Sequence, residues 1–156
     1  MSDGMERRTF LRTAALATGG IWLGSVVAAQ GFTGHVAVEE ALFSGINRAK
    51  DPAQKTPLEK KHVPVIEAPA RVKAGEPFAV TVTVGETLHP MGAAHYIDYV
   101  ELLAGNEPAG RVEFRSAFSQ PKATFFMVLD KPVTLVASIS CNLHGLWQSE
   151  LEMPVG

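Results

Sequence analysis

Apolar and polar residues alternate in short runs from residue 63 to the C-terminus. The stretch 77–85, PFAVTVTVG, places phenylalanine and three valines at every second position, with alanine and threonine between them. This period of two is typical of a β-strand with one buried face. Similar stretches, separated by clusters of glycine, proline and asparagine, predict further strands at residues 63–69, 95–105, 110–118, 123–129, 132–140 and 146–153.

About seven short strands with frequent turns and no helix between them predict an all-β fold. We expect an immunoglobulin-like antiparallel β-sandwich that occupies residues 58–156. The cysteine–tryptophan–cysteine signature of antibody domains is absent, because the chain contains one cysteine.

Residues 30–57 form a predicted extension in front of the sandwich. Its segment VEEALFSGINRAK, residues 38–50, has leucine, phenylalanine and isoleucine at helical spacing, but a glycine between them weakens the pattern. We therefore expect at most a short helix there. The segment DPAQKTP, residues 51–57, is polar and contains two prolines, which predicts a connecting loop.

The first 29 residues have the layout of a targeting segment. Arg7 and Arg8 precede an apolar run from Ala14 to Ala29, which ends in small residues that suit a signal peptidase. The run is shorter than the roughly 20 apolar residues of a membrane span. It resembles a twin-arginine signal peptide, which implies export of the folded chain to the periplasm. The alternatives are a membrane anchor and a chance basic start.

Composition changes this picture little. The chain has 156 residues, of which 46% are hydrophobic and 19% charged, as expected for one globular domain. A formal net charge of -2 gives no reason to expect nucleic acid or an anionic membrane surface as a partner. The single cysteine, Cys141, excludes an internal disulfide and a four-cysteine metal site within one chain.

Histidine and cysteine carry the candidate chemistry. A lone histidine at a strand end is commonly a polar residue with satisfied hydrogen bonds, and a lone cysteine beside valine and alanine is commonly a small core residue. Here, however, four of the five histidines lie close to predicted strand ends, where the loops of a sandwich converge. We assign no role to His35. The candidate metal ligands are His62, His89, His95, Cys141 and His144.

This set of residue types favours some metals over others. Five ligands exceed a closed tetrahedral zinc site, and oxygen ligands are too few for calcium or magnesium. A copper site would use two histidines with Cys141 and Met153, and would leave two histidines without a purpose. Four imidazoles and one thiolate favour a redox iron that acts on a small oxygen species, because a thiolate pushes electron density onto the metal.

Three motifs together resemble one family. KHVPVIEAP at residues 61–69, HPMGAAHYIDYVELL at 89–103 and CNLHGLW at 141–147 are similar to superoxide reductases, the neelaredoxin and desulfoferrodoxin family. The likeness extends from about residue 42 to the C-terminus. It implies an immunoglobulin-like sandwich with one mononuclear non-haem iron, four equatorial imidazoles and Cys141 as the axial thiolate. With a single cysteine, the chain looks like the one-iron branch, which lacks the four-cysteine iron domain.

The resemblance also implies an activity. Ferrous iron would reduce superoxide to hydrogen peroxide by one electron, and an external donor, rubredoxin or another small redox protein, would reduce the ferric iron again. Lys61 would be the catalytic lysine that attracts the anion and helps to stabilise bound peroxide; the alternative is a solvated surface lysine beside Lys60. The sequence leaves the oligomeric state open, a homo-oligomer included.

The chain departs from the family pattern in two places: in the loop between His89 and His95, which reads PMGAA where many relatives have acidic residues, and two residues before His62. Relatives commonly have Glu-Lys-His, and that glutamate caps the oxidised iron, whereas Lys60 occupies the position here and Glu59 lies one residue further back. An ammonium group has no lone pair to donate to a metal. If the segment is extended, Glu59 and Lys60 point to opposite sides, so we expect Glu59 to cap weakly or not at all.

Two other classes of function stay open on the sequence. One is an exported iron or copper electron carrier. The other is a sulfur-compound carrier with a sandwich fold, in which the cysteine lies on a flexible glycine-rich tail. Cys141 is instead followed by NLHGLW within a predicted strand and turn, which disfavours the second class.

Overall fold

The computed structural model describes residues 39–156. The predicted signal peptide, the start of the predicted extension and His35 therefore lie outside the described residues. None of the helices within residues 39–156 has the length and apolar character of a membrane span.

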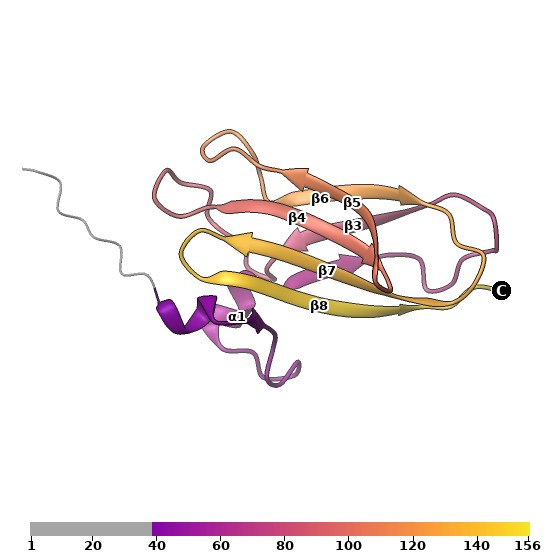
Figure 1. Cartoon of the computed structure of the whole chain (residues 1–156), viewed down its shortest axis with the longest axis horizontal. Coiled ribbons are helices and arrows are strands. Elements are labelled where there is room, and N and C mark those ends of the chain that lie inside the picture. Colours follow the sequence, from indigo (N-terminus) through magenta and orange to yellow (C-terminus); the bar gives the residue numbers. More distant parts are fainter. Residues whose placement is uncertain (1–38) are drawn as a thin grey trace, which may run out of the picture. The chain divides into compact units, whose positions relative to one another are not determined.

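Two β-sheets face each other (Figure 1). The larger sheet has the order β1-β8-β7-β4-β5, with bounds Ile46–Asn47, Gly145–Met153, Val133–Cys141, Ile97–Ala104 and Glu107–Glu113. The smaller sheet has the order β2-β3-β6, with bounds Pro64–Glu67, Phe78–Val84 and Lys122–Met127. All pairs are antiparallel except β1 with β8. The seven predicted strands are all present, and the predicted sandwich is confirmed.

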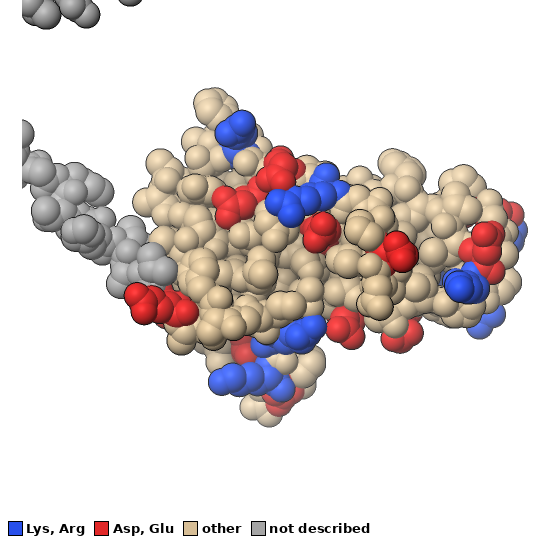
Figure 2. Space-filling model, in the orientation of Figure 1, with Lys and Arg blue, Asp and Glu red and all other residues tan. Residues whose placement is uncertain are grey.

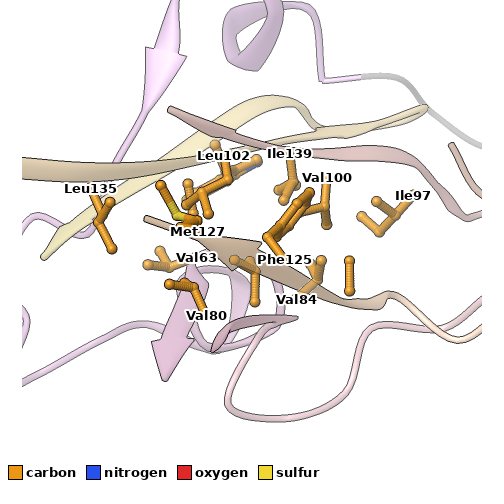
Figure 3. Close-up of a cluster of buried hydrophobic side chains, with 14 of the residues drawn as sticks. Val63, Val80, Val84, Ile97, Val100, Leu102, Phe125, Met127, Leu135 and Ile139 are labelled. Carbon is orange, nitrogen blue, oxygen red and sulfur yellow. The ribbon is translucent and has the colours of Figure 1, made fainter. Parts of the chain in front are cut away.

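The hydrophobic core fills the space between the sheets (Figure 3). Along β3 every second side chain is buried, and Val80, Val82 and Val84 have no exposed surface. The alternate residues face outward, where the hydroxyl groups of Thr81 and Thr124 are hydrogen-bonded at 2.9 Å. Burial of the inward side chains stabilises the fold by roughly 25 cal/mol per Å² of apolar surface, so the alternation seen in the sequence is what holds the two sheets together.

A short helix precedes β2, where no helix was predicted. Helix α1, Pro57–His62, begins at the last residue of the predicted loop and ends at His62, which we expected close to the start of a strand. Its start is a capping box: the Thr56 hydroxyl accepts a hydrogen bond from Glu59 N at 3.2 Å, and the Glu59 carboxylate accepts one from Thr56 N at 2.7 Å. Pro57 occupies the first helical position, where a backbone N–H would have no partner within the helix, so the missing N–H of proline costs no hydrogen bond. These local bonds favour the helix over an extended segment.

Two further predictions need correction. The helix expected within residues 38–50 is a four-residue 3-10 helix, η1, at Glu40–Phe43, and β1 follows it. Strand β5 begins three residues earlier than predicted, because the turn after β4 takes only residues 105–106 and Glu107 already pairs with Ala104. Since β1 pairs with β8, part of the predicted extension contributes to the larger sheet.

Candidate metal centre

Five side chains meet at one end of the sandwich, on the left in Figure 1, where β3 and β7 end and β4 and β8 begin. Their potential ligand atoms all lie within 4.8 Å of one another. The structure thus brings together every predicted ligand: His62, His89, His95, Cys141 and His144.

Loops and element ends position these side chains. His62 is the last residue of α1, and Cys141 is the last residue of β7. His144 lies in the turn between β7 and β8, one residue before β8 begins. His89 and His95 lie in the loop between β3 and β4 rather than at the strand ends where we expected them. The clustering was therefore predicted, but the elements that carry three of the histidines were not.

The four imidazole rings form a square. Ring centroids of neighbouring histidines are 4.7, 4.4, 4.8 and 4.6 Å apart, and neighbouring ring planes are inclined by 69° to 80°. The diagonal from His62 to His95 is longer, at 5.9 Å. Rings set nearly perpendicular around a common centre can each direct one nitrogen at that centre. The order around the square is His62, His89, His95, His144.

Hydrogen bonds fix which nitrogen two of the rings offer. The Nδ1–H of His62 donates to the Leu58 carbonyl at 2.8 Å, and the Nδ1–H of His89 donates to the Pro90 carbonyl at 2.6 Å. A neutral imidazole with its proton on Nδ1 has a lone pair on Nε2. The two Nε2 atoms nevertheless lie 3.1 Å apart. Two facing lone pairs repel each other unless a cation lies between them, so this arrangement fits a metal ion.

A third nitrogen points to the same conclusion. The Nε2 atom of His95 is buried and has no hydrogen-bond partner among the described residues. Buried polar atoms in native proteins are nearly always paired. A metal ion bound by the square supplies the missing partner, and the backbone bonds of the other rings are the outer contacts that commonly orient metal-binding histidines.

Cys141 adds a sulfur from the interior. Its side chain is fully buried, and Sγ lies 3.6 Å from Nε2 of His89 and 3.4 Å from Nδ1 of His144. His144 therefore presents Nδ1, unlike His62 and His89. Burial raises the pKa of the Cys141 thiol. Binding to a metal reverses this effect, because metal ions bind the deprotonated thiolate.

The electrostatics keep the histidines neutral. Burial lowers the pKa of His62 to about 4 and that of His89 to about 3. Burial also lowers the pKa values of His95 and His144, although these two side chains are only half-buried. At neutral pH all four rings have the deprotonated nitrogen that a metal requires. The half-buried pair marks the side on which solvent reaches the centre.

Charges of both signs act on this solvent side. After burial and His144, the positive charge of Lys61 is a further cause of the lowered pKa of His95. The negative charge of Glu39 opposes the effect of burial on the pKa of His144. Lys61 therefore acts on one half-exposed ligand and Glu39 on the other.

Asn142 connects the two halves of the centre. Its side chain accepts a hydrogen bond from Tyr96 N at 2.8 Å and donates one to the Ala94 carbonyl at 3.0 Å. Its own backbone N–H donates to the Tyr96 carbonyl at 3.2 Å. These three bonds hold the residues on both sides of His95 against the residue that follows Cys141. Sequence reasoning missed this contact, and its one signal was an asparagine inside the CNLHGLW motif.

Two glycines allow the close packing of the ligand-bearing segments. Gly85 has φ +81°, and a Cβ atom there would meet the Lys61 carbonyl at 2.5 Å. Gly145 has φ +71°, and a Cβ atom there would overlap the Leu42 carbonyl. Only glycine adopts this backbone conformation at low cost. Gly85 thus lets the loop with His89 lie against α1, and Gly145 lets the β7–β8 turn lie against η1.

Glu59 is committed to the backbone. Its side chain is 5% exposed, and its two oxygens accept hydrogen bonds from Lys50 N at 3.0 Å and Thr56 N at 2.7 Å. The Lys50 bond, followed by the Thr56 bonds, lowers the pKa of the carboxyl group. The extended geometry that we expected here was wrong, because Glu59 belongs to α1. To reach the metal centre, its carboxylate would have to leave both partners.

The comparisons with known proteins agree with this site. A family model described as Desulfoferrodoxin matches residues 54–150. A protein named Superoxide reductase from Pyrococcus horikoshii is 38% identical over 104 residues, which cover 60% of this chain and 88% of that protein. A solved structure titled Superoxide reductase (Neelaredoxin) from Ignicoccus hospitalis is 37% identical, with a TM-score of 0.62 and coverage of 76% of this chain and 98% of that one. From the matched family model, the fold and the five converging ligands, the chain belongs to the desulfoferrodoxin family.

Proposed function

We propose that this protein is a superoxide reductase with one mononuclear non-haem iron. The observation that carries the proposal is the square of four imidazoles completed by one buried thiol. Nitrogen and sulfur ligands in this number disfavour calcium, magnesium and a closed zinc site. Iron held by these five residues would supply the one electron that, together with two protons, converts superoxide into hydrogen peroxide.

The ligand residues have separate tasks. His62 and His89 are held by carbonyl groups, so each keeps a fixed tautomer and a fixed ring orientation. Cys141 contributes a thiolate, which favours electron donation from the metal. His95 and His144 are only half-buried, so a small anion would approach the centre from their side.

Lys61 attracts that anion. It is exposed, and its charge acts on both His62 and His95. An ammonium group beside an opening raises the local concentration of small anions, and its three N–H donors can hydrogen-bond to a bound oxygen species. The neighbouring Lys60 is exposed as well, and we assign it no part in the reaction.

The protein acts outside the cytoplasm in this proposal. Arg7 and Arg8, the apolar run and its small terminal residues support export by the twin-arginine route to the periplasm. That route carries folded proteins, so the metal can be bound before export. The electron consumed in each turnover is returned by an external one-electron carrier.

Metal analysis with an optical spectrum tests the site. Protein produced without oxygen should contain one iron per chain, and the oxidised form should absorb visible light through thiolate-to-iron charge transfer. Cys141→Ser should abolish this band. Stoichiometric zinc without iron, or a visible band that persists in Cys141→Ser, would contradict the proposal.

A further inference from the structure

We propose that Phe43, Ile46 and Leu146 form the docking patch for the electron donor, and that this donor is a redox protein with a basic rim around its own centre. The inference rests on the proposed function, which requires an external one-electron donor. Together these three residues are the donor patch.

The donor patch is exposed and continuous with the sheet edge. The three side chains are 48%, 47% and 38% exposed, respectively. Ile46 and Leu146 are paired residues of β1 and β8, so they lie side by side. Asn47 secures this edge, because its side chain donates hydrogen bonds to the carbonyls of Leu42 and Leu146, both at 2.8 Å. The patch therefore lies on an ordered backbone.

The donor patch adjoins the ligands. Leu146 follows His144 by two residues. Gly145, which lies between them, is paired with Cys141 across the β7–β8 turn, and Leu146 is paired with Ser140. A protein bound on the patch would thus contact the strand segments that carry the thiolate and the half-exposed imidazole. The exposed Phe126, in contrast, lies in β6 of the other sheet.

The size of the patch favours a transient partner over a second copy of this chain. Stable interfaces bury roughly 800 Å² on each partner, with about 20–30 residues a side. Three partly exposed apolar side chains supply only a fraction of that. Encounters between electron-transfer proteins lie at the small end of the range, and a donor must dissociate after each electron.

The charges beside the patch select the sign of the partner. Glu39 and Glu40 are exposed next to the donor patch, at the start of the described chain, where Figure 2 shows an acidic cluster. Two cations follow Ile46: Arg48 lies 3.7 Å from Glu150, which offsets its charge, and Lys50 is exposed. The side of the patch that η1 forms is therefore acidic, and it steers a basic surface towards the patch.

The electron transfer from the carrier to the metal centre involves one electron and no other group. In each turnover the reduced carrier loses one electron, the oxidised metal centre gains it, and no atom or proton needs to move between the proteins. The carrier leaves in its one-electron-oxidised form.

The test measures by stopped flow how fast three reductants re-reduce the oxidised protein. Two are protein carriers with a reduction potential below that of the metal centre: a basic c-type cytochrome and an acidic rubredoxin. The third is ascorbate, a small molecule that needs no docking surface. The double variant Ile46→Thr/Leu146→Thr keeps strand-forming residues and removes apolar surface. We expect it to slow the cytochrome reaction at least tenfold and to leave the ascorbate rate unchanged. Phe126→Thr, on the other sheet, is the matched control and should change neither rate.

Charge is tested separately. Glu39→Lys/Glu40→Lys should slow the reaction with the basic carrier and accelerate that with the acidic one. Glu107→Lys, at the start of β5 beside the far end of β4, should do neither. An unchanged cytochrome rate in the patch variant overturns the proposal, as does a native protein that prefers the acidic carrier. A native protein that is dimeric in solution, together with a patch variant that is monomeric, also overturns the proposal. Failure of the proposed function looks different, because the ferrous protein would then not react with superoxide in the absence of any carrier.

Discussion

At the scale of single residues, the centre depends on contacts that fix one atom at a time. Asn142 shows this most clearly, since it holds the residues on both sides of His95. We expect Asn142→Ala to release iron to a chelator about tenfold faster, because the loss of a residue that orients a metal ligand commonly weakens metal binding. Asn106→Ala, in the exposed β4–β5 turn, is the control. An unchanged release rate in Asn142→Ala would show that the three hydrogen bonds do not hold His95.

The role of Lys61 is also decided at this scale. Lys61→Ala should slow the reaction of the ferrous protein with superoxide about tenfold at low salt, because electrostatic steering raises association rates by roughly 10–1000-fold. The difference should shrink near 0.1 M salt, where the screening length is about 10 Å. Pulse radiolysis across ionic strengths measures both effects. Lys60→Ala should have a smaller effect, and an equal effect of both substitutions would contradict the assignment.

At the scale of elements, the short helix α1 decides the position of one ligand and removes one carboxylate from the chemistry. Thr56→Ala should lower the free energy of unfolding by about 1 kcal/mol through loss of the N-cap, as measured by denaturant titration. Glu59→Ala should also lower the melting temperature, because it removes the hydrogen bonds that the carboxylate accepts from Thr56 N and Lys50 N, and it should hardly change the visible spectrum of the ferric protein. A large spectral shift in Glu59→Ala would mean that its carboxylate does reach the iron.

The same helix shows where sequence reasoning reached its limit. A period of two identified all seven predicted strands, because apolar residues at every second position share one face of a strand but are scattered around a helix. Helix α1 has six residues, too few for a helical period to be visible. Its capping-box signature, Thr56 followed three residues later by Glu59, is present in the sequence, but the polar residues and two prolines before it favoured a loop. The ligand types were visible in the sequence as histidines and a cysteine near turns. The square of rings and the Asn142 contacts were not, because they depend on how separate loops converge.

At the scale of the whole molecule, export through the predicted signal segment and iron binding at the metal centre can be tested together. Substitution of Arg7 and Arg8 by lysine should leave the protein in the cytoplasm, since the twin-arginine pair is the recognised feature of that export route. Cell fractionation with an antibody against the chain measures this. The cytoplasmic form should still contain iron, because the ligands all lie within residues 62–144. Unchanged delivery to the periplasm would contradict the assigned route.

The metal centre is proposed to reduce superoxide without dismutating it. This is tested when stoichiometric ferrous protein reacts with a known pulse of superoxide and both hydrogen peroxide and dioxygen are quantified. We expect one hydrogen peroxide and one oxidised metal centre for each superoxide consumed, and no dioxygen. Dioxygen formed together with half as much peroxide, or superoxide that decays at its uncatalysed rate, would contradict it.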